Sequence, residues 1–78
     1  MSRPRVVLVG GAGVFGSRLA RGLVATTDAE VLIAGRDLGR AQSAAREIGA
    51  AGAIVLDRTR DTAADIAALN AELVIDAA

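Results

Sequence analysis

Four apolar runs of strand length alternate along the chain with segments of helical periodicity. The predicted strands cover residues 6–9, 30–34, 53–57 and 73–76. In the second of them, β-branched and aliphatic residues follow one another without polar alternation, which is typical of a parallel strand covered on both faces. The pattern therefore predicts strands that lie inside a parallel sheet.

Two of the segments between these strands have helical spacing. The first predicted helix covers about residues 14–25 and has Phe15, Leu19 and Leu23 on one face. The second covers residues 38–48, and its apolar residues recur at spacings of three and four. Each helix therefore has one apolar face.

The ends of the later helices also have recognisable signals. Asp37 occupies the N-cap position of the second helix, and Gly49 occupies its C-cap position. After a polar loop, Asp61 or Thr62 begins a short third helix. Its inward residues are Ile66 and Leu69.

The predicted order is βαβαβαβ, with connections too short for anything but right-handed crossovers between parallel strands. We expect an α/β fold, a doubly wound parallel sheet of Rossmann-like type with the strand order 3-2-1-4. The strand over residues 73–76 is then an edge, although Leu73, Val74 and Ile75 carry no charge or proline that would protect it. We therefore expect residues 1–78 to be the N-terminal nucleotide-binding segment of a longer protein. A homodimer that pairs these edges is the alternative.

A cluster of glycines joins the first strand to the first helix. Gly11, Gly13 and Gly16 fit G-x-G-x-x-G, whereas Gly10, Gly13 and Gly16 fit G-x-x-G-x-x-G. A strand, a glycine turn and a helix in this order are typical of dinucleotide binding. The spacing leaves both registers open.

Each part of this turn has a physical role in holding phosphates. The first glycine allows a sharp turn, Gly13 lets a pyrophosphate approach the backbone, and Gly16 lets the helix pack closely on the strand. Unpaired N–H groups of the first helical turn, which begins at Val14 and Phe15, point toward the phosphates. We therefore predict that this turn binds the cofactor.

The residues after the second strand favour NADP over NAD. NAD-specific sites usually have an acid at this carboxyl end of the strand, but here Gly35 and then Arg36 follow. A guanidinium binds a 2′-phosphate in bidentate fashion. Glu30 lies at the opposite end of the strand, so it does not fit the acidic position. The alternative is that Arg36 is only a solvated loop residue.

Three other charged residues lie near the expected cofactor side. Arg40, one turn into the second helix, adds a second positive charge. Asp57, at the end of the third strand, either accepts a hydrogen bond from the adenine amino group or caps the loop that follows it. For Asp76 a structural role is favoured over a catalytic one, because it has no visible partner in the sequence.

Composition removes several classes of site. Nine arginines balance nine acids, so net charge favours neither nucleic acid nor a membrane as partner. The chain has no Cys, His, Lys, Tyr or Trp, which argues against a zinc site and excludes disulfides and a lysine-containing phosphate loop. We predict no metal site and no catalytic residue. The apolar runs are too short for a transmembrane helix, and we expect a cytoplasmic protein.

The glycine cluster, the run from Ala34 to Asp37, Asp57 and the run from Val74 to Ala78 resemble the N-terminal NADP-binding segment of saccharopine dehydrogenase-like oxidoreductases. Extended short-chain dehydrogenases and NmrA-like proteins have a similar turn and a similar arginine. The resemblance implies a parent enzyme that transfers a hydride between NADP(H) and a small-molecule substrate. It also implies a further domain that supplies the substrate site and the catalytic residues.

Two other function classes remain open. A regulatory protein that senses NAD(P) without turnover needs the same turn, because fold and motif do not fix function. A purely structural α/β module with an unused glycine turn is the third reading. The residues that follow Ala78 distinguish an enzyme from a regulator.

Overall fold

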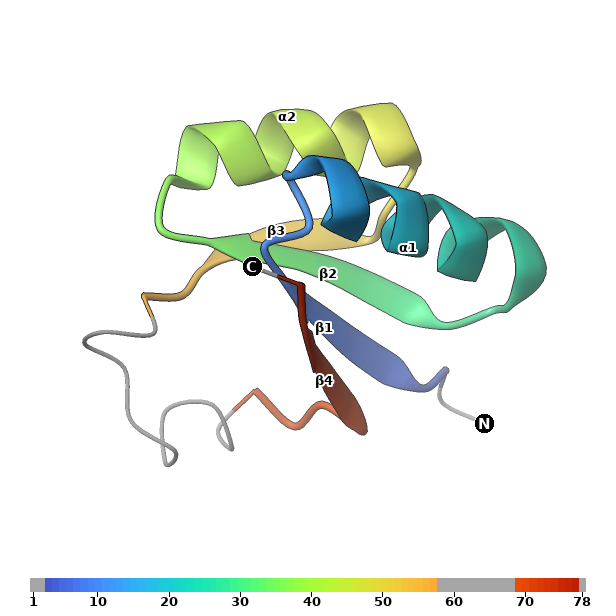
Figure 1. Ribbon diagram of the computed structural model, residues 1–78. Coiled ribbons are helices and arrows are strands. Elements are labelled where there is room, and N and C mark those ends of the chain that lie inside the picture. Colours follow the sequence, from blue (N-terminus) through green and yellow to red (C-terminus); the bar gives the residue numbers. More distant parts are fainter. Residues whose placement is uncertain (1–2, 58–68, 78) are drawn as a thin grey trace.

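The computed structural model describes residues 3–57 and 69–77. Its elements are β1 (Arg5–Val9), α1 (Val14–Thr26), β2 (Glu30–Gly35), α2 (Leu38–Ile48), β3 (Gly52–Val55) and β4 (Leu73–Asp76). The four described strands are parallel and lie in the order β3-β2-β1-β4 (Figure 1). The predicted Rossmann-like α/β fold and its strand order are therefore confirmed.

Strand pairing moves several of the predicted boundaries. β2 includes Gly35, because Gly35 pairs with Val55 of β3. The same ladder begins at Gly52, so β3 starts one residue earlier than predicted and ends two residues before Asp57. The predicted third helix begins at Asp61 or Thr62 and includes Ile66 and Leu69, and its residues before Leu69 lie outside the described residues.

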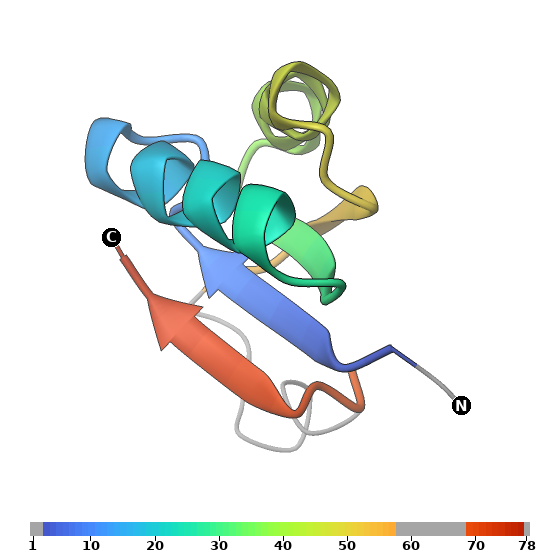
Figure 2. The ribbon, with the colours of Figure 1, turned by 90° about the vertical axis from the view of Figure 1, so that its right-hand side faces the viewer.

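Both helices cover the same face of the sheet (Figures 1 and 2). Small helix residues allow close packing there, and the cluster on this face contains Val6, Leu8, Val31 and Ile33 with Ala20, Ala41 and Ala45. A second cluster lies on the opposite face and contains Val7, Val9, Ala34 and Leu56, with Leu69 partly buried against it. Burial on both faces explains why β1 and β2 lack polar alternation.

The caps of α2 agree with the sequence prediction. The backbone N–H of Arg40 donates to Asp37 Oδ1 at 3.1 Å, which satisfies one of the helix's first N–H groups. At the other end Gly49 has φ of 82°, and its N–H donates to the Ala45 carbonyl oxygen at 2.9 Å. A left-handed glycine of this kind ends the helix without a steric penalty.

The apolar face predicted for α1 is correct only in part. Leu19 and Leu23 pack against the core, but Phe15 is 64% exposed. Gly16 and Ala20 are the buried residues of this helix. Since Gly16 is the residue that approaches the preceding turn, the neighbouring Phe15 side chain is directed away from the sheet.

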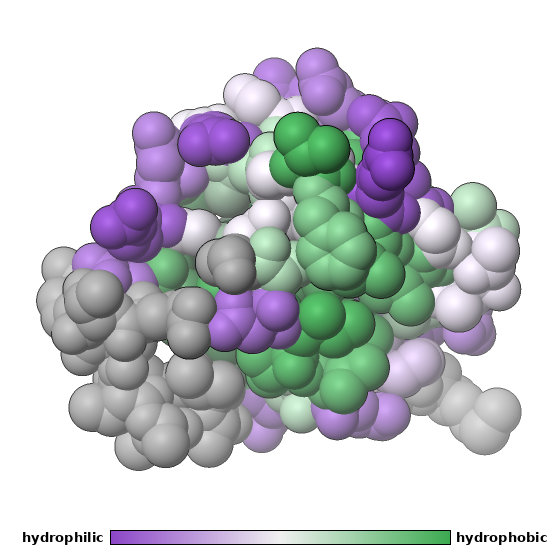
Figure 3. Space-filling model, viewed as in Figure 1, coloured by the Kyte–Doolittle hydropathy of each residue, from purple (hydrophilic) through white to green (hydrophobic). Residues whose placement is uncertain are grey.

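β4 has β1 as its neighbour and no second neighbour among the described strands. Its Leu73 side chain is 51% exposed, and Val74 is exposed as well. Figure 3 shows that apolar surface gathers over β4 and the start of α1. The described part of the chain thus has an apolar sheet edge.

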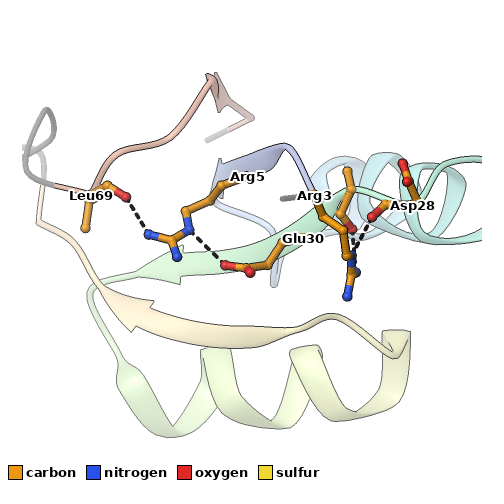
Figure 4. A network of polar contacts seen from close by, with 6 residues as sticks. Arg3, Arg5, Asp28, Glu30 and Leu69 are labelled. Carbon is orange, nitrogen blue, oxygen red and sulfur yellow. Dashed lines mark hydrogen bonds and ion pairs between the residues drawn. The ribbon is translucent and has the colours of Figure 1, made fainter. Parts of the chain in front are cut away.

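Two arginines link the amino ends of the strands (Figure 4). Arg5 Nε lies 2.8 Å from Glu30 Oε1, and a second nitrogen of Arg5 donates to the Leu69 carbonyl oxygen at 2.8 Å. Arg3 Nε donates to the Asp28 carbonyl oxygen at 2.6 Å. These contacts hold the loops at this end of the sheet, away from the glycine turn.

Candidate functional site

The glycine turn follows directly from the carboxyl end of β1. Gly10 has φ of 81°, a conformation that side chains oppose. Its N–H donates to the Ala34 carbonyl oxygen at 2.9 Å, and its own carbonyl oxygen accepts from the Gly13 N–H at 3.0 Å. Gly10 is therefore the glycine that makes the sharp turn, which selects the G-x-x-G-x-x-G register.

Gly16 brings α1 onto this turn. A Cβ on Gly16 would overlap the Gly10 carbonyl oxygen and lie 2.8 Å from the Gly11 Cα. Backbone atoms cannot move aside as the end of a flexible side chain can. Gly16 thus has the helix-packing role that the sequence predicted.

Gly11 is required for a different reason from the one that its motif position suggests. It is buried and does not have a positive φ. A Cβ on it would lie 2.9 Å from Ile33 Cδ1 in β2. The absent side chain of Gly11 thus makes room for the sheet beneath the turn.

The amino end of α1 is open to an acceptor. Gly13 is the N-cap and provides no side-chain hydrogen bond, and the first turn contains no acid. The N–H groups of Val14, Phe15 and Gly16 have no acceptor within the helix. The Val14 side chain is 80% exposed. This end of the helix has the donors and the dipole that favour an anion.

A hollow of about 470 Å³ lies beside the turn, at the carboxyl ends of the strands. It contains Gly10 and Gly13 from the turn, Arg36 and Arg40 from the β2–α2 segment, and Asp57 after β3. Its apolar walls include Val9, Ala34, Ala41 and Leu56. The hollow brings together five residues that were singled out from widely separated parts of the sequence.

Four other predicted cofactor residues do not line this hollow. Gly11 and Gly16 are buried in the turn, where they act through packing. Val14 and Phe15 lie at the exposed start of α1, and their backbone N–H groups belong to its first turn. None of the four residues brings a polar side chain to the hollow.

Arg36 and Arg40 provide the positive charge of the hollow. Both are exposed, and neither has an ion-pair partner among residues 3–57 and 69–77. Asp37 lies between them but accepts the Arg40 N–H as the helix cap. A Cβ on Gly35 would have no heavy atom within 4 Å. The end of β2 thus combines two guanidinium groups with open space.

The three carboxylates considered from sequence lie in different places. Asp57 lines the hollow, and the preceding Leu56 is held beside the end of β2 by its N–H bond to the Gly35 carbonyl oxygen at 2.9 Å. Asp76 ends β4 opposite Val9 and does not line the hollow. Glu30 pairs with Arg5 at the opposite end of the strands.

The sequence does not reveal the whole hollow. Ala41 lies in a predicted helix and Leu56 in a predicted strand, and both contribute to the walls of the hollow. Helical spacing alone does not show which inward residues reach the strand ends.

Among the described residues, no group of three or more potential metal-ligating side chains occurs. No described helix has the length and apolar character needed to cross a membrane.

Two solved structures have the same fold and related sequences. The chain is 33% identical to apo histidine-tagged saccharopine dehydrogenase (L-Glu forming) from Saccharomyces cerevisiae over 96% of its own length, with a TM-score of 0.78. It is 30% identical to a short chain dehydrogenase/reductase family protein, again over 96% of its length, with a TM-score of 0.81. It spans 16% of the first protein and 33% of the second. No protein-family model and no curated protein matches the chain. The resemblance to a saccharopine dehydrogenase-like Rossmann domain is confirmed.

Proposed function

We propose that this saccharopine dehydrogenase-like Rossmann domain binds NADP(H) for an oxidoreductase. The observation that carries the proposal is the single hollow that joins the glycine turn to Arg36. The two solved structures described above are named as a saccharopine dehydrogenase and a short chain dehydrogenase/reductase family protein, which supports a nicotinamide dinucleotide as the ligand. The proposal assigns the chain to cofactor binding and leaves the reacting substrate to other residues.

The residues present fit such a ligand. The pyrophosphate accepts hydrogen bonds from the uncapped N–H groups at the start of α1, next to Gly13, where no side chain blocks its approach. Arg36 binds the 2′-phosphate, and Arg40 adds positive charge beside it. Asp57 accepts a hydrogen bond from the adenine amino group. The apolar walls of the hollow cover the adenine ring.

The bound nicotinamide supplies the hydride chemistry, and this chain orients it. Among the described residues that line the hollow, the acidic ones are Asp37 and Asp57, and the proposal places both beside the adenosine half of the ligand. We therefore assign the small-molecule substrate and its proton transfer to a further domain of the same enzyme.

The exposed edge of β4 supports a longer protein. Leu73 and Val74 form an apolar edge that folded proteins usually cover or protect with charge. The two similar structures extend well beyond the matched part. We propose that further chain continues the sheet beyond β4 and completes the enzyme.

A titration of the full-length protein with NADPH and NADH tests the proposed function. We expect NADPH to bind at least about tenfold more tightly than NADH. A hydrogen bond to a charged group contributes about 1.5–3 kcal/mol, and about 1.4 kcal/mol corresponds to a tenfold difference in affinity. Arg36→Ala should remove most of this preference by weakening NADPH binding. Arg21→Ala, an exposed arginine on α1 outside the hollow, is the matched control. A preference for NADH in the parent protein would remove the role given to Arg36.

A further inference from the structure

A contact beneath the glycine turn is not explained by phosphate binding. The Cβ that Gly11 lacks would lie 2.9 Å from Cδ1 and 3.1 Å from Cγ2 of Ile33. Ile33 belongs to β2 and is 0% exposed. Ile33 does not line the hollow, so it cannot contact a ligand there. Its side chain instead lies under the turn that would hold the phosphates.

Ile33 has little freedom to move. Its Cβ is branched, which restricts the χ1 rotamers open to it. The side chain belongs to the core cluster between the sheet and both helices, and such interiors are close-packed. Its backbone is paired with Leu8 of β1 in the ladder. The end of this side chain is therefore a rigid support.

The turn is held from other directions as well. The Gly11 N–H donates to the Leu8 carbonyl oxygen at 3.3 Å, and the Gly10 N–H donates to the Ala34 carbonyl oxygen. These two hydrogen bonds and the contact with Ile33 together fix the distance of the turn from the sheet. That distance determines where Gly13 and the first N–H groups of α1 lie.

We infer that Ile33 is a positioning residue whose side chain, in contact with Gly11, sets the position of the pyrophosphate-binding turn. The inference rests on the proposed function, since it concerns the same site. Its consequence is selective. A displaced turn weakens binding of the pyrophosphate, while the Arg36 side of the hollow keeps its geometry.

Two probes separate these halves of the site in the full-length protein. NADPH contains the pyrophosphate, whereas adenosine 2′-phosphate contains the adenine and the 2′-phosphate without it. We expect Gly11→Ala to weaken NADPH binding about tenfold, because the added methyl group overpacks the contact with Ile33 and displaces the turn. The same variant should change adenosine 2′-phosphate binding by less than about twofold. Gly22→Ala is the matched control, because a Cβ there has no heavy atom within 4 Å.

The double variant Gly11→Ala/Ile33→Val tests the contact itself. Ile33→Val removes Cδ1, the nearest atom, and leaves the branched Cβ. We expect it to restore at least about threefold of the lost NADPH affinity, since the remaining contacts, with Cγ2 at 3.1 Å and with the Leu8 carbonyl oxygen at 3.2 Å, are less severe.

Three results would overturn the inference while the proposed function stands. They are unchanged NADPH binding in Gly11→Ala, an equal loss for both probes, and no recovery in the double variant. Failure of the parent protein to bind NADPH would instead overturn the proposed function, and this inference with it.

Discussion

Gly10, Gly16 and Gly35 show how the position of a missing side chain determines what a glycine does. Gly10 has a positive φ, whereas Gly16 lies where a Cβ would overlap backbone. Gly35 has neither constraint, and open space surrounds the place of its Cβ. The first two are therefore structural requirements of the turn, whereas under the proposed function Gly35 leaves room for the 2′-phosphate.

Gly16→Ala should destabilise the fold by about 2–3 kcal/mol, because the added methyl forces α1 away from the turn. Gly22→Ala, on the same helix, should stabilise it by about 0.5–1 kcal/mol through helix propensity. Urea unfolding of both variants measures the difference. Equal free energies of unfolding would show that the close approach at Gly16 is unimportant.

Gly35→Asp should remove the preference for NADPH over NADH. The added Cβ meets no heavy atom within 4 Å, and a carboxylate on it lies in the hollow that Arg36 lines, where it repels the 2′-phosphate and offers an acceptor to ribose hydroxyls. We expect NADPH affinity to fall by about tenfold or more relative to NADH. Gly35→Asn, a neutral side chain of the same shape, is the control, and dinucleotide titrations give both ratios. An unchanged ratio in Gly35→Asp would place the 2′-phosphate elsewhere.

At the level of elements, the amino ends of α1 and α2 differ in how their N–H groups are satisfied. Asp37 caps α2 through the Arg40 N–H, whereas α1 begins at Gly13 without a side-chain cap. An uncapped helix at the end of a glycine turn keeps its donors available for a ligand. The capped helix instead contributes Arg40 to the same hollow, beside Arg36 from the connection before the helix.

Asp37→Ala should cost about 1 kcal/mol of stability, because the Arg40 N–H loses its acceptor. Asp37→Asn keeps a capping oxygen and should leave stability nearly unchanged. It also removes a negative charge from the hollow, so NADPH binding should become about two- to threefold tighter at low salt. Thermal unfolding and NADPH titration check the two effects. A comparable loss of stability in both variants would contradict the capping role.

The sequence predicted the elements well because periodicity and end signals are local. Asp37 and Gly49 were correctly placed at the ends of α2. The sequence leaves the register of the glycines open. The spacing of glycines does not show which of them has a positive φ or which atoms pack against each Cα. Phe15 was grouped with Leu19 and Leu23 because helical spacing does not show that Gly16 faces the turn.

At the scale of the whole molecule, the strand order places the glycine turn, Arg36 and Asp57 at one end of the sheet. Parallel strands bring their carboxyl ends to the same edge, so residues far apart in sequence line one hollow. This arrangement was predictable from the βαβ order alone. The shape of the hollow was not, since it depends on how deeply Ala41 and Leu56 pack.

In the full-length protein, a lysine introduced in β4 should lower the free energy of unfolding more than a lysine introduced in β3. Leu73 of β4 and Val55 of β3 are similarly exposed in the chain, at 51% and 45%. If further chain covers β4, Leu73→Lys buries a charge and should cost about 2 kcal/mol or more. Val55→Lys should change stability by less than about 0.5 kcal/mol. Equal, small effects in denaturant unfolding would contradict the proposed continuation of the sheet beyond β4.

The most direct test of the central claim is a crystal structure of the full-length protein with NADP⁺. We predict that the pyrophosphate accepts hydrogen bonds from the first N–H groups of α1 and that Arg36 contacts the 2′-phosphate. A pyrophosphate bound away from the turn between Gly10 and Gly16, or a 2′-phosphate without contact to Arg36, would contradict the account.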